Sequence, residues 1–328
     1  MQRKKILFTS TLASTFILED LKLLRKHYDV THLRVTGALA PFRILAAVPS
    51  SDVTYTWLAS VYAFFVVFFA RLFGRKSIVI IGGADASKMP ELRYGIWLSP
   101  WKVPLLKWTM RHAFRLLVVD PSLTPEVIRL ARYGGENIVY APTGYDSEVW
   151  KPAGEKEPSV LTVAGCHDRW RMRKKGLDIL FEAARMCPGV KFVVIGMRRG
   201  LIDETRESVP PNVELIPFLD QPALLPYYQR AKVYCQPSYT EGLPNSLCEA
   251  MLCCCVPVGT NVGGIPTAIG ECGYLVPYGD AGQLAGAIRQ ALQVPAEAGS
   301  RAREFIARTF TVERRENALR EVIQEATR

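Results

Sequence analysis

Short apolar segments alternate with helical stretches along the whole 328-residue chain. This alternation is typical of parallel α/β domains, in which each helix connects one strand to the next. The sequence therefore predicts an α/β fold. The pattern predicts strands at residues 5–9, 30–34, 52–56, 77–81, 115–119, 137–140, 160–164, 191–195, 213–216, 232–236, 256–259 and 274–276.

One polar segment rich in proline and glycine, residues 151–159, interrupts the alternation near the middle of the chain. Such composition indicates a linker between domains. We therefore expect a first Rossmann-like domain at residues 1–150 and a second at residues 160–301. A last helical stretch, residues 302–328, follows the second domain.

The longest apolar run, residues 57–70, is shorter than the roughly 20 residues that a bilayer-spanning helix needs. Predicted strands precede and follow it, so we interpret it as a buried helix of a βαβ unit. The basic start of the chain is followed by an apolar segment too short for a signal peptide. Eight cysteines without paired spacing also fit a reducing compartment. We therefore expect a cytoplasmic protein.

The net charge of +10 is unevenly distributed. Residues 1–157 hold 21 Lys and Arg against 13 Asp and Glu, a difference of +8, whereas residues 158–328 hold 20 against 18, a difference of +2. No nucleic-acid-binding motif accompanies the positive half. An anionic lipid surface or a phosphorylated acceptor is the better candidate partner, and nucleic acid is not expected.

Residues 101–115 contain features that support an anionic lipid surface as the partner. Lys107, Arg111 and Arg115 recur at every fourth position, and Trp101 and Trp108 suit a membrane interface. The segment predicts either a solvated helix face opposite an apolar stripe or a peripheral contact with the inner face of a membrane.

The most informative segment reads Ser238-Tyr-Thr-Glu-Gly-Leu-Pro-Asn-Ser-Leu-Cys-Glu-Ala-Met251. It lies between two predicted strands, so it starts at the carboxyl end of a parallel strand, where open α/β sheets bind ligands. Glu241 is expected in the loop and Glu249 about two turns into the following helix. The backbone N–H groups at the start of that helix form an anion site. These groups belong to Gly242, Leu243, Asn245 and Ser246.

Two further motifs follow, Val256-Pro-Val-Gly-Thr-Asn-Val-Gly-Gly-Ile-Pro266 and Gly273-Tyr-Leu-Val-Pro-Tyr-Gly-Asp280. In this order the three motifs resemble the donor-binding half of the retaining family-4 glycosyltransferases (glycosyltransferase group 1). The resemblance implies a GT-B architecture, with two Rossmann-like domains facing across a cleft and the last helix packing back on the first domain. It also implies retention of the anomeric configuration and a nucleotide-diphosphate sugar as donor substrate.

The resemblance assigns roles to residues of the second domain. Glu241 approaches the transferred sugar, the backbone of Gly242 and Leu243 holds the sugar hydroxyls, and Glu249 accepts hydrogen bonds from the ribose. Pro244, Asn245 and Ser246 complete the donor-binding run. The positive first half and the basic segment at residues 101–115 are the basis for the hypothesis of a saccharide or lipid-linked acceptor of cell-envelope polysaccharide biosynthesis.

The resemblance also implies that an arginine and a lysine after the strand at residues 160–164 bind the diphosphate, and they map to Arg173 and Lys175. Both residue types suit phosphate binding. The loop is longer than usual, so another cation could take the place of Arg173. The alternatives are Arg169, Arg171 and Lys174.

In the first domain, the run Gly82-Gly-Ala-Asp-Ala-Ser87 follows the fourth predicted strand. Many similar enzymes carry a histidine in this region. Asp85 is therefore either a polar contact to sugar or acceptor, or a turn and helix-capping residue.

Several functions are disfavoured by motifs that the sequence lacks. The first predicted strand is followed by no G-x-G-x-x-G turn, which argues against a dinucleotide-dependent dehydrogenase. No D-x-D triplet appears, so neither a metal nor another cofactor is expected. Two alternatives to a transferase remain: a sugar epimerase or hydrolase on the same fold, and an inactive nucleotide-sugar-binding protein. The last would be expected to have lost Lys175 or one of the two glutamates.

Overall fold

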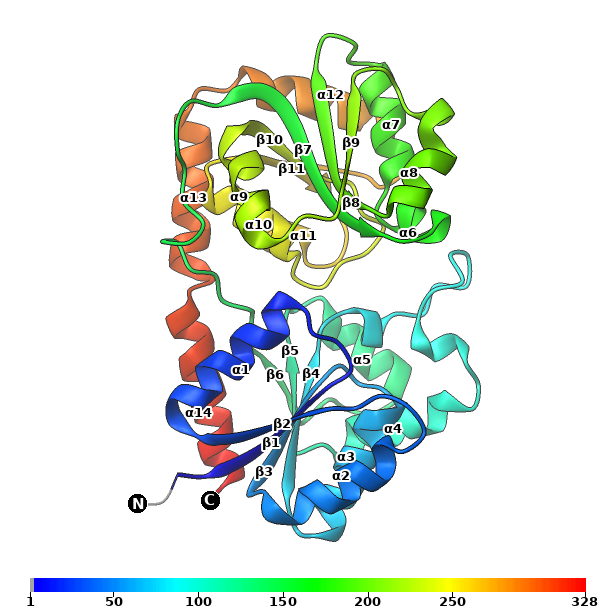
Figure 1. Ribbon diagram of the computed structural model, residues 1–328, viewed down its shortest axis with the longest axis vertical. Coiled ribbons are helices and arrows are strands. Elements are labelled where there is room, and N and C mark those ends of the chain that lie inside the picture. Colours follow the sequence, from blue (N-terminus) through cyan, green and yellow to red (C-terminus); the bar gives the residue numbers. More distant parts are fainter. Residues whose placement is uncertain (1–2) are drawn as a thin grey trace. The chain divides into compact units, whose positions relative to one another are not determined.

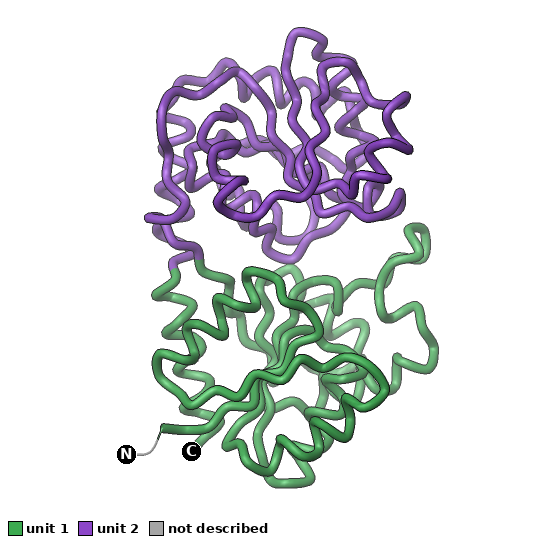
Figure 2. The backbone as a smooth tube through the Cα atoms, in the orientation of Figure 1, with its two compact units in different colours: residues 1–144, 312–328 green, residues 145–311 purple. Residues whose placement is uncertain are grey.

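The computed structural model describes residues 3–328, which form two compact units (Figure 2). Unit 1 contains the described residues up to Gly144 together with Val312–Arg328, and unit 2 contains Tyr145–Thr311. Each unit is built around a six-stranded parallel sheet flanked by helices (Figure 1). The prediction of an α/β protein with two Rossmann-like domains is confirmed.

In unit 1 the strands lie in the order β2-β1-β3-β4-β5-β6. The central strands are buried over almost their whole length, as expected for parallel strands covered on both faces. The strands are β1 Lys5–Ser10, β2 Asp29–Arg34, β3 Val53–Trp57, β4 Lys76–Ile81, β5 Arg115–Val118 and β6 Ile138–Tyr140. The helices are α1 Thr15–His27, α2 Ala40–Ala47, α3 Val61–Leu72, α4 Lys102–His112, α5 Leu123–Ala131 and α14 Val312–Ala326, with 3₁₀ turns at Val48–Ser50, Ala84–Ala86 and Ile96–Leu98.

In unit 2 the order is β12-β11-β10-β7-β8-β9, so the chain winds outward in both directions from β7 and β10. The strands are β7 Glu157–Cys166, β8 Lys191–Met197, β9 Val213–Pro217, β10 Ala231–Gln236, β11 Val256–Thr260 and β12 Tyr274–Val276. The helices are α6 Arg169–Lys174, α7 Leu177–Arg185, α8 Arg199–Thr205, α9 Gln221–Arg230, α10 Asn245–Leu252, α11 Ile265–Ile269, α12 Ala281–Gln293 and α13 Glu297–Thr309, with a 3₁₀ turn at Arg206–Ser208.

The boundaries between the units differ from the expected positions. The division falls after Gly144, and the last part of the expected linker is already strand, because β7 begins at Glu157. The expected terminal helix at residues 302–328 is two helices: α13 belongs to unit 2 and α14 to unit 1. They are separated at Phe310, whose backbone is not helical (φ −120°, ψ 55°) and whose carbonyl accepts from the N–H of Tyr145.

The apolar run at residues 57–70 is shared between the end of β3 and helix α3, whose inner side is buried. Helix α3 packs against α2 in one apolar cluster. Nowhere in residues 3–328 is a helix both long and apolar enough to cross a bilayer.

Helix α4 contains most of the segment for which a solvated face or a membrane contact was expected. Trp108 is half-buried and stacks on His112, with ring centroids 4.4 Å apart. Arg111 donates to the carbonyls of Ala131 and Arg132 at the end of α5. Arg115, the first residue of β5, pairs with Glu325. Several residues of the segment at residues 101–115 therefore make contacts with other parts of unit 1.

A buried ion pair fixes α14 to the rest of unit 1. Arg315 donates from Nε to Asp20 Oδ1 at 2.9 Å and from Nη2 to Asp20 Oδ2 at 2.6 Å, and both side chains are at most 3% exposed. Asp20 also accepts from the Tyr55 hydroxyl and the Trp57 indole. Arg315 further donates to the carbonyl of Ala141. Both oxygens of the buried Asp20 carboxylate thus accept hydrogen bonds, which a buried charge pair requires.

We expect Arg315→Met to destabilise unit 1 by about 3–5 kcal/mol, because it leaves the Asp20 carboxylate buried without its cation. Urea unfolding followed by circular dichroism measures the loss. The matched control is Arg320→Met on the exposed side of the same helix. Equal stability of the two variants would contradict this account of how α14 is held.

Candidate functional site

The candidate site of unit 2 lies at the carboxyl ends of the neighbouring strands β7 and β10. From these two strands the chain proceeds to opposite sides of the sheet. Such a switch point is where open α/β sheets bind ligands, because the two following loops diverge and leave room between them. The loop after β7 leads through α6 to Lys175, and the loop after β10 carries Glu241.

Lys175 and Glu241 form an ion pair, although 66 positions separate them in the chain. Lys175 Nζ lies 2.6 Å from Glu241 Oε1. The same oxygen accepts from Ser238 Oγ at 2.8 Å and from Gln236 Nε2 at 3.0 Å. The Glu241 side chain is 13% exposed and that of Lys175 is 23% exposed, so both reach solvent.

The charges around Glu241 determine its protonation state. Burial alone would raise the pKa of Glu241, but Lys175 and Lys174, with the hydrogen bonds from Lys175 and Ser238, hold it below its usual value. Burial lowers the pKa of Lys174 to about 8, with Glu241 opposing that shift. At neutral pH the site therefore contains one carboxylate beside two lysines, and it favours an anionic ligand.

Two glycines let the loops approach this closely. Gly176 has φ +66°, and a Cβ there would lie 1.9 Å from the carbonyl oxygen of Pro237. Gly263 has φ +51°, and a Cβ there would lie 2.2 Å from the carbonyl oxygen of Glu241. At both positions the positive φ angle disfavours a side chain, and there is no space for one. The glycines of the Lys-Gly and Val-Gly-Gly motifs thus position the loops around Glu241.

The loop after Glu241 leads into α10, which begins directly after Pro244. Within the described chain, the N–H groups of Gly242, Leu243 and Ser246 make no backbone hydrogen bond. N–H groups without a backbone partner at the start of a helix can donate to a ligand. The Asn245 side chain is already engaged, because its Oδ1 accepts from the Tyr145 hydroxyl at 2.7 Å.

Glu249 lies in the second turn of α10 and is 9% exposed. Its Oε2 accepts from the Tyr228 hydroxyl at 3.0 Å. Burial raises the pKa of Glu249 to about 7, and the bond from Tyr228 opposes the shift. Glu249 thus differs from Glu241 in charge at neutral pH as well as in depth.

A chain of polar side chains links the two glutamates. Tyr234 donates to Gln236 Oε1 at 3.0 Å, and Gln236 in turn donates to Glu241. The Ser246 hydroxyl lowers the pKa of both Tyr234 and Tyr228, although burial raises both overall, and Tyr228 donates to Glu249. The sequence analysis missed Gln236, Tyr234 and Tyr228. A polar residue at the end of an otherwise apolar strand, as Gln236 is, is the signal that could have indicated one of them.

The cations proposed for a diphosphate differ in their partners. Arg171 pairs with Asp168 at 2.6 Å, and Arg169 donates to the carbonyl of Glu204 at 3.2 Å. Arg173 is exposed, and its side chain makes no hydrogen bond or ion pair with the rest of residues 3–328. Of these three arginines, Arg173 is therefore the one available to a ligand.

Asp85 of unit 1 is buried and accepts hydrogen bonds from backbone N–H groups. Its Oδ2 accepts from the N–H of Ala59, and its Oδ1 accepts from the N–H groups of Gly82 and Gly83, all within 3.0 Å. It is 3% exposed. Burial raises its pKa to about 6, while these backbone bonds oppose the shift. Both oxygens thus connect the loops after β3 and β4, which favours the turn role over a sugar contact.

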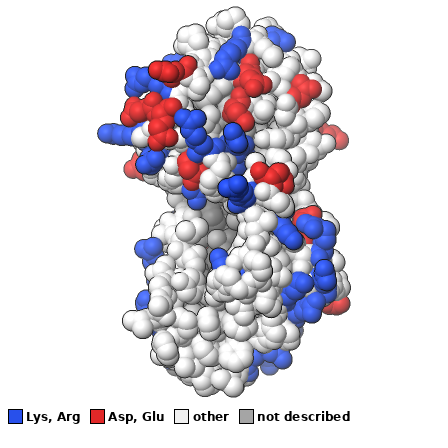
Figure 3. All heavy atoms as spheres, turned by 90° about the vertical axis from the view of Figure 1, so that its right-hand side faces the viewer, with Lys and Arg blue, Asp and Glu red and all other residues white. Residues whose placement is uncertain are grey.

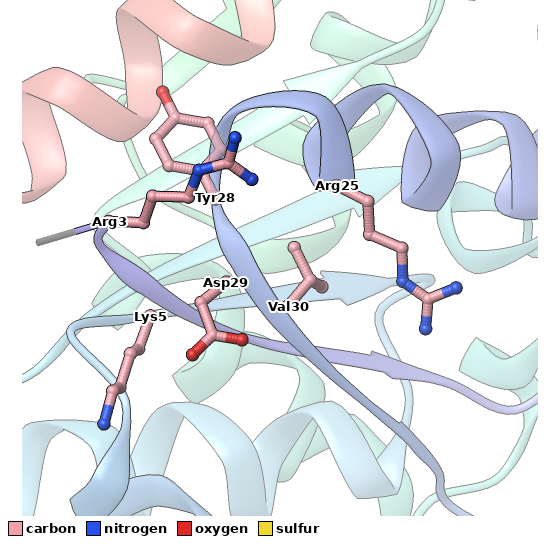
Figure 4. Close-up of a pocket in the computed structure, with 6 residues that line it drawn as sticks. All are labelled: Arg3, Lys5, Arg25, Tyr28, Asp29 and Val30. Carbon is pink, nitrogen blue, oxygen red and sulfur yellow. The ribbon is translucent and has the colours of Figure 1, made fainter.

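A second pocket, of about 480 Å³, lies in unit 1 near the amino ends of β1 and β2 (Figure 4). Arg3, Lys5 and Arg25 line it, but their charged ends point in different directions. It lies at the opposite end of the strands from the usual ligand position. In the part of the chain that is described, no three His, Cys, Asp or Glu side chains are grouped to hold a metal ion.

Comparison with known proteins identifies the segment that carries the site. Residues 157–294 match the family described as Glycosyl transferases group 1. This segment belongs to the group 1 glycosyltransferase family. The resemblance inferred from the three motifs is thereby confirmed, while membership of family 4 stays a prediction.

Curated relatives of the group 1 glycosyltransferase segment are similar over part of their length. The chain is 32% identical over 247 residues to D-inositol 3-phosphate glycosyltransferase of Mycobacterium avium, covering 66% of this chain and 57% of that protein. It is 27% identical over 205 residues to glycogen synthase of Mycobacterium tuberculosis, covering 60% and 50%. The chain spans about half the length of the curated relatives it matches.

Solved structures support the fold over nearly the whole chain. Anabaena Alr3699/HepE in complex with UDP has a TM-score of 0.78 at 16% identity, covering 98% of this chain and 100% of that one. Sucrose-phosphate synthase of Thermosynechococcus elongatus has a TM-score of 0.78 at 16% identity, covering 98% and 99%. With two Rossmann-like units and these neighbours, the chain has the GT-B fold.

We expect Glu249→Gln to flatten the pH dependence of stability. Burial raises the pKa of Glu249 from 4.5 to about 7. Between these values the folded protein binds a proton that the unfolded chain releases, so the wild type loses stability as pH rises. The full loss is about 3 kcal/mol.

Urea unfolding at about pH 5 and about pH 7.5 measures this difference. Glu207→Gln, an exposed site in the same unit, is the matched control. A pH dependence of Glu249→Gln equal to that of the control would show that the Glu249 carboxyl titrates normally.

Proposed function

We propose that the protein is a retaining glycosyltransferase that moves a sugar from a nucleotide-diphosphate sugar to a saccharide or lipid-linked acceptor. The observation that carries the proposal is the Glu241 carboxylate, ion-paired with Lys175 at the switch point of a group 1 glycosyltransferase domain. The site offers lysine and arginine cations, backbone N–H donors and one carboxylate, that of Glu241, which can accept hydrogen bonds.

The cations suit the leaving group. When the bond between the anomeric carbon and the diphosphate oxygen breaks, negative charge develops on the diphosphate and must be stabilised. Lys175 and the exposed Arg173 would supply positive charge, and the half-buried Lys174 would add to it. The N–H groups at the start of α10 add uncharged donors.

Glu241 suits the sugar. Because its pKa is held low, it is ionised at neutral pH and accepts hydrogen bonds from sugar hydroxyls rather than donating a proton. Its negative charge also favours the positive charge that develops at the anomeric centre. Glu249 would accept from the ribose hydroxyls. The acceptor oxygen then bonds to the anomeric carbon on the face that the diphosphate leaves, and its proton passes to the departing phosphate.

The protonation states argue against the hydrolase alternative. A glycosidase needs a protonated carboxyl group that can reach the glycosidic oxygen. The pKa of Glu241 lies below the usual value, and Glu249, whose pKa burial raises to about 7, is buried against Tyr228. The inactive-protein alternative is disfavoured because Lys175 and both glutamates are present and arranged around one site.

We expect Glu241→Gln to lower kcat/KM for sugar transfer by at least about 100-fold, because the charge facing the anomeric centre is lost. Nucleotide affinity should remain, since Lys175 and Arg173, which are assigned to the diphosphate, are both still present. Release of nucleotide from UDP-, GDP- and ADP-sugars, together with calorimetric titration of the nucleotides, measures both quantities. Glu207→Gln is the control, and near-wild-type transfer by Glu241→Gln would refute the role of Glu241.

A series of cation variants tests which side chains bind the diphosphate. Lys175→Met is expected to lower kcat/KM by about 100-fold and Arg173→Met by less, because Arg173 is more exposed to water. Arg171→Met should remain near wild type, since Arg171 is paired with Asp168. If Lys174→Met exceeds Arg173→Met in its effect, Lys174 is the second phosphate ligand. A large effect of Arg171→Met would contradict the assignment.

A further inference from the structure

The outward side of helix α2 is apolar, although it faces solvent. Its inward residues Ala40 and Ile44 are buried against α3 in a shared apolar cluster. On the opposite side, Leu39 and Phe42 are each 69% exposed and Leu45 is 36% exposed. A surface helix normally turns polar residues to water, so an apolar outward side indicates a partner.

Helix α3 continues this surface. Leu72 is 65% exposed, while Phe68 and Phe73 are each 41% exposed. Phe68 contacts Phe69, with ring centroids 5.5 Å apart, and Phe69 packs on the cluster shared with α2. Because the two helices pack on each other through this cluster, their exposed apolar side chains are together called here the α2–α3 face. Its residues are Leu39, Phe42, Leu45, Phe68, Leu72 and Phe73.

The stretch of chain that contains α2 and α3 carries charges of mostly one sign. Between Asp29 and Asp85 the only acidic residue is Asp52, whose Oδ2 accepts from the N–H of Lys5. The same stretch contains five cations. In Figure 3, broad areas of the lower unit, unit 1, carry no charged side chain, and the charged ones that border them are mostly blue. The cations are Arg34, Arg43, Arg71, Arg75 and Lys76.

We propose that the α2–α3 face docks on the surface of an anionic lipid bilayer. Phenylalanine and leucine side chains would enter the boundary between headgroups and acyl chains, which lowers the free energy by removing apolar area from water. The exposed guanidinium groups of Arg34, Arg43 and Arg71 match negative headgroups. A protein partner would more commonly meet a mixture of both charges and polar groups at the border.

This surface adjoins the segment that the sequence indicates. In residues 101–115, Trp108, Arg111 and Arg115 have partners within unit 1, whereas Trp101 is 62% exposed. Phe68 of the α2–α3 face contacts Trp108, with ring centroids 5.9 Å apart. The inference concerns a surface of unit 1 and does not depend on the proposed transferase activity.

Co-sedimentation of the whole protein with vesicles tests the proposal, without any nucleotide or acceptor. We expect binding to vesicles of phosphatidylglycerol and phosphatidylcholine, and weaker binding to phosphatidylcholine alone. The double variant Phe42→Ser, Leu72→Ser should reduce partitioning by at least roughly tenfold. Its control is Met186→Ser, Phe218→Ser, two exposed apolar positions of unit 2. Because all four positions are exposed, the variants should unfold at similar urea concentrations.

A second pair of variants separates charge from apolar insertion. Arg43→Gln and Arg71→Gln should each reduce binding to the anionic vesicles by about fivefold and leave binding to phosphatidylcholine unchanged. Absence of lipid binding by the wild type would overturn the proposal. So would equal binding by the apolar double variant and its control. If the wild type instead forms a dimer that Phe42→Ser, Leu72→Ser dissociates, and binds no vesicles, the face belongs to a second copy of the chain.

Discussion

The ion pair between Lys175 and Glu241 is the interaction on which the candidate site depends. It connects the loops that follow two neighbouring strands, and with Gln236 and Ser238 it fixes one carboxylate oxygen by three donors. The geometry requires backbone to lie against backbone at Gly176 and Gly263, where a side chain would collide with a carbonyl oxygen. The glycines of the motifs and the charged residues beside them therefore form one arrangement.

Much of the fold could be predicted from the sequence. All twelve strands appear near the expected positions, because strands buried on both faces leave continuous apolar runs. The loop of Glu241 and the start of α10 could also be predicted, since both follow directly from one motif. Local sequence thus determined the elements and the ends of strands at which ligands bind.

The partners of the site residues could not be predicted, because they depend on the order of strands in the sheet. Lys175 lies next to Glu241 because β10 is adjacent to β7 in the sheet. This adjacency cannot be inferred from any local sequence pattern. The pair of Arg315 and Asp20 spans 295 positions for the same reason. The sequence pattern likewise indicated only part of the exposed apolar surface: it pointed to Trp101, which is exposed, and to Trp108, which stacks on His112, and it passed over the exposed Phe42.

The central claim is that the site transfers a sugar, and proton NMR of the anomeric signals during incubation tests it most directly. The wild type would be incubated with a nucleotide-diphosphate sugar and saccharide or lipid-linked acceptors. The account predicts that the donor signal is replaced by that of a glycoside with the same anomeric configuration, together with free nucleoside diphosphate. Release of free reducing sugar, an epimerised nucleotide sugar, or an unchanged donor across UDP-, GDP- and ADP-sugars would contradict it.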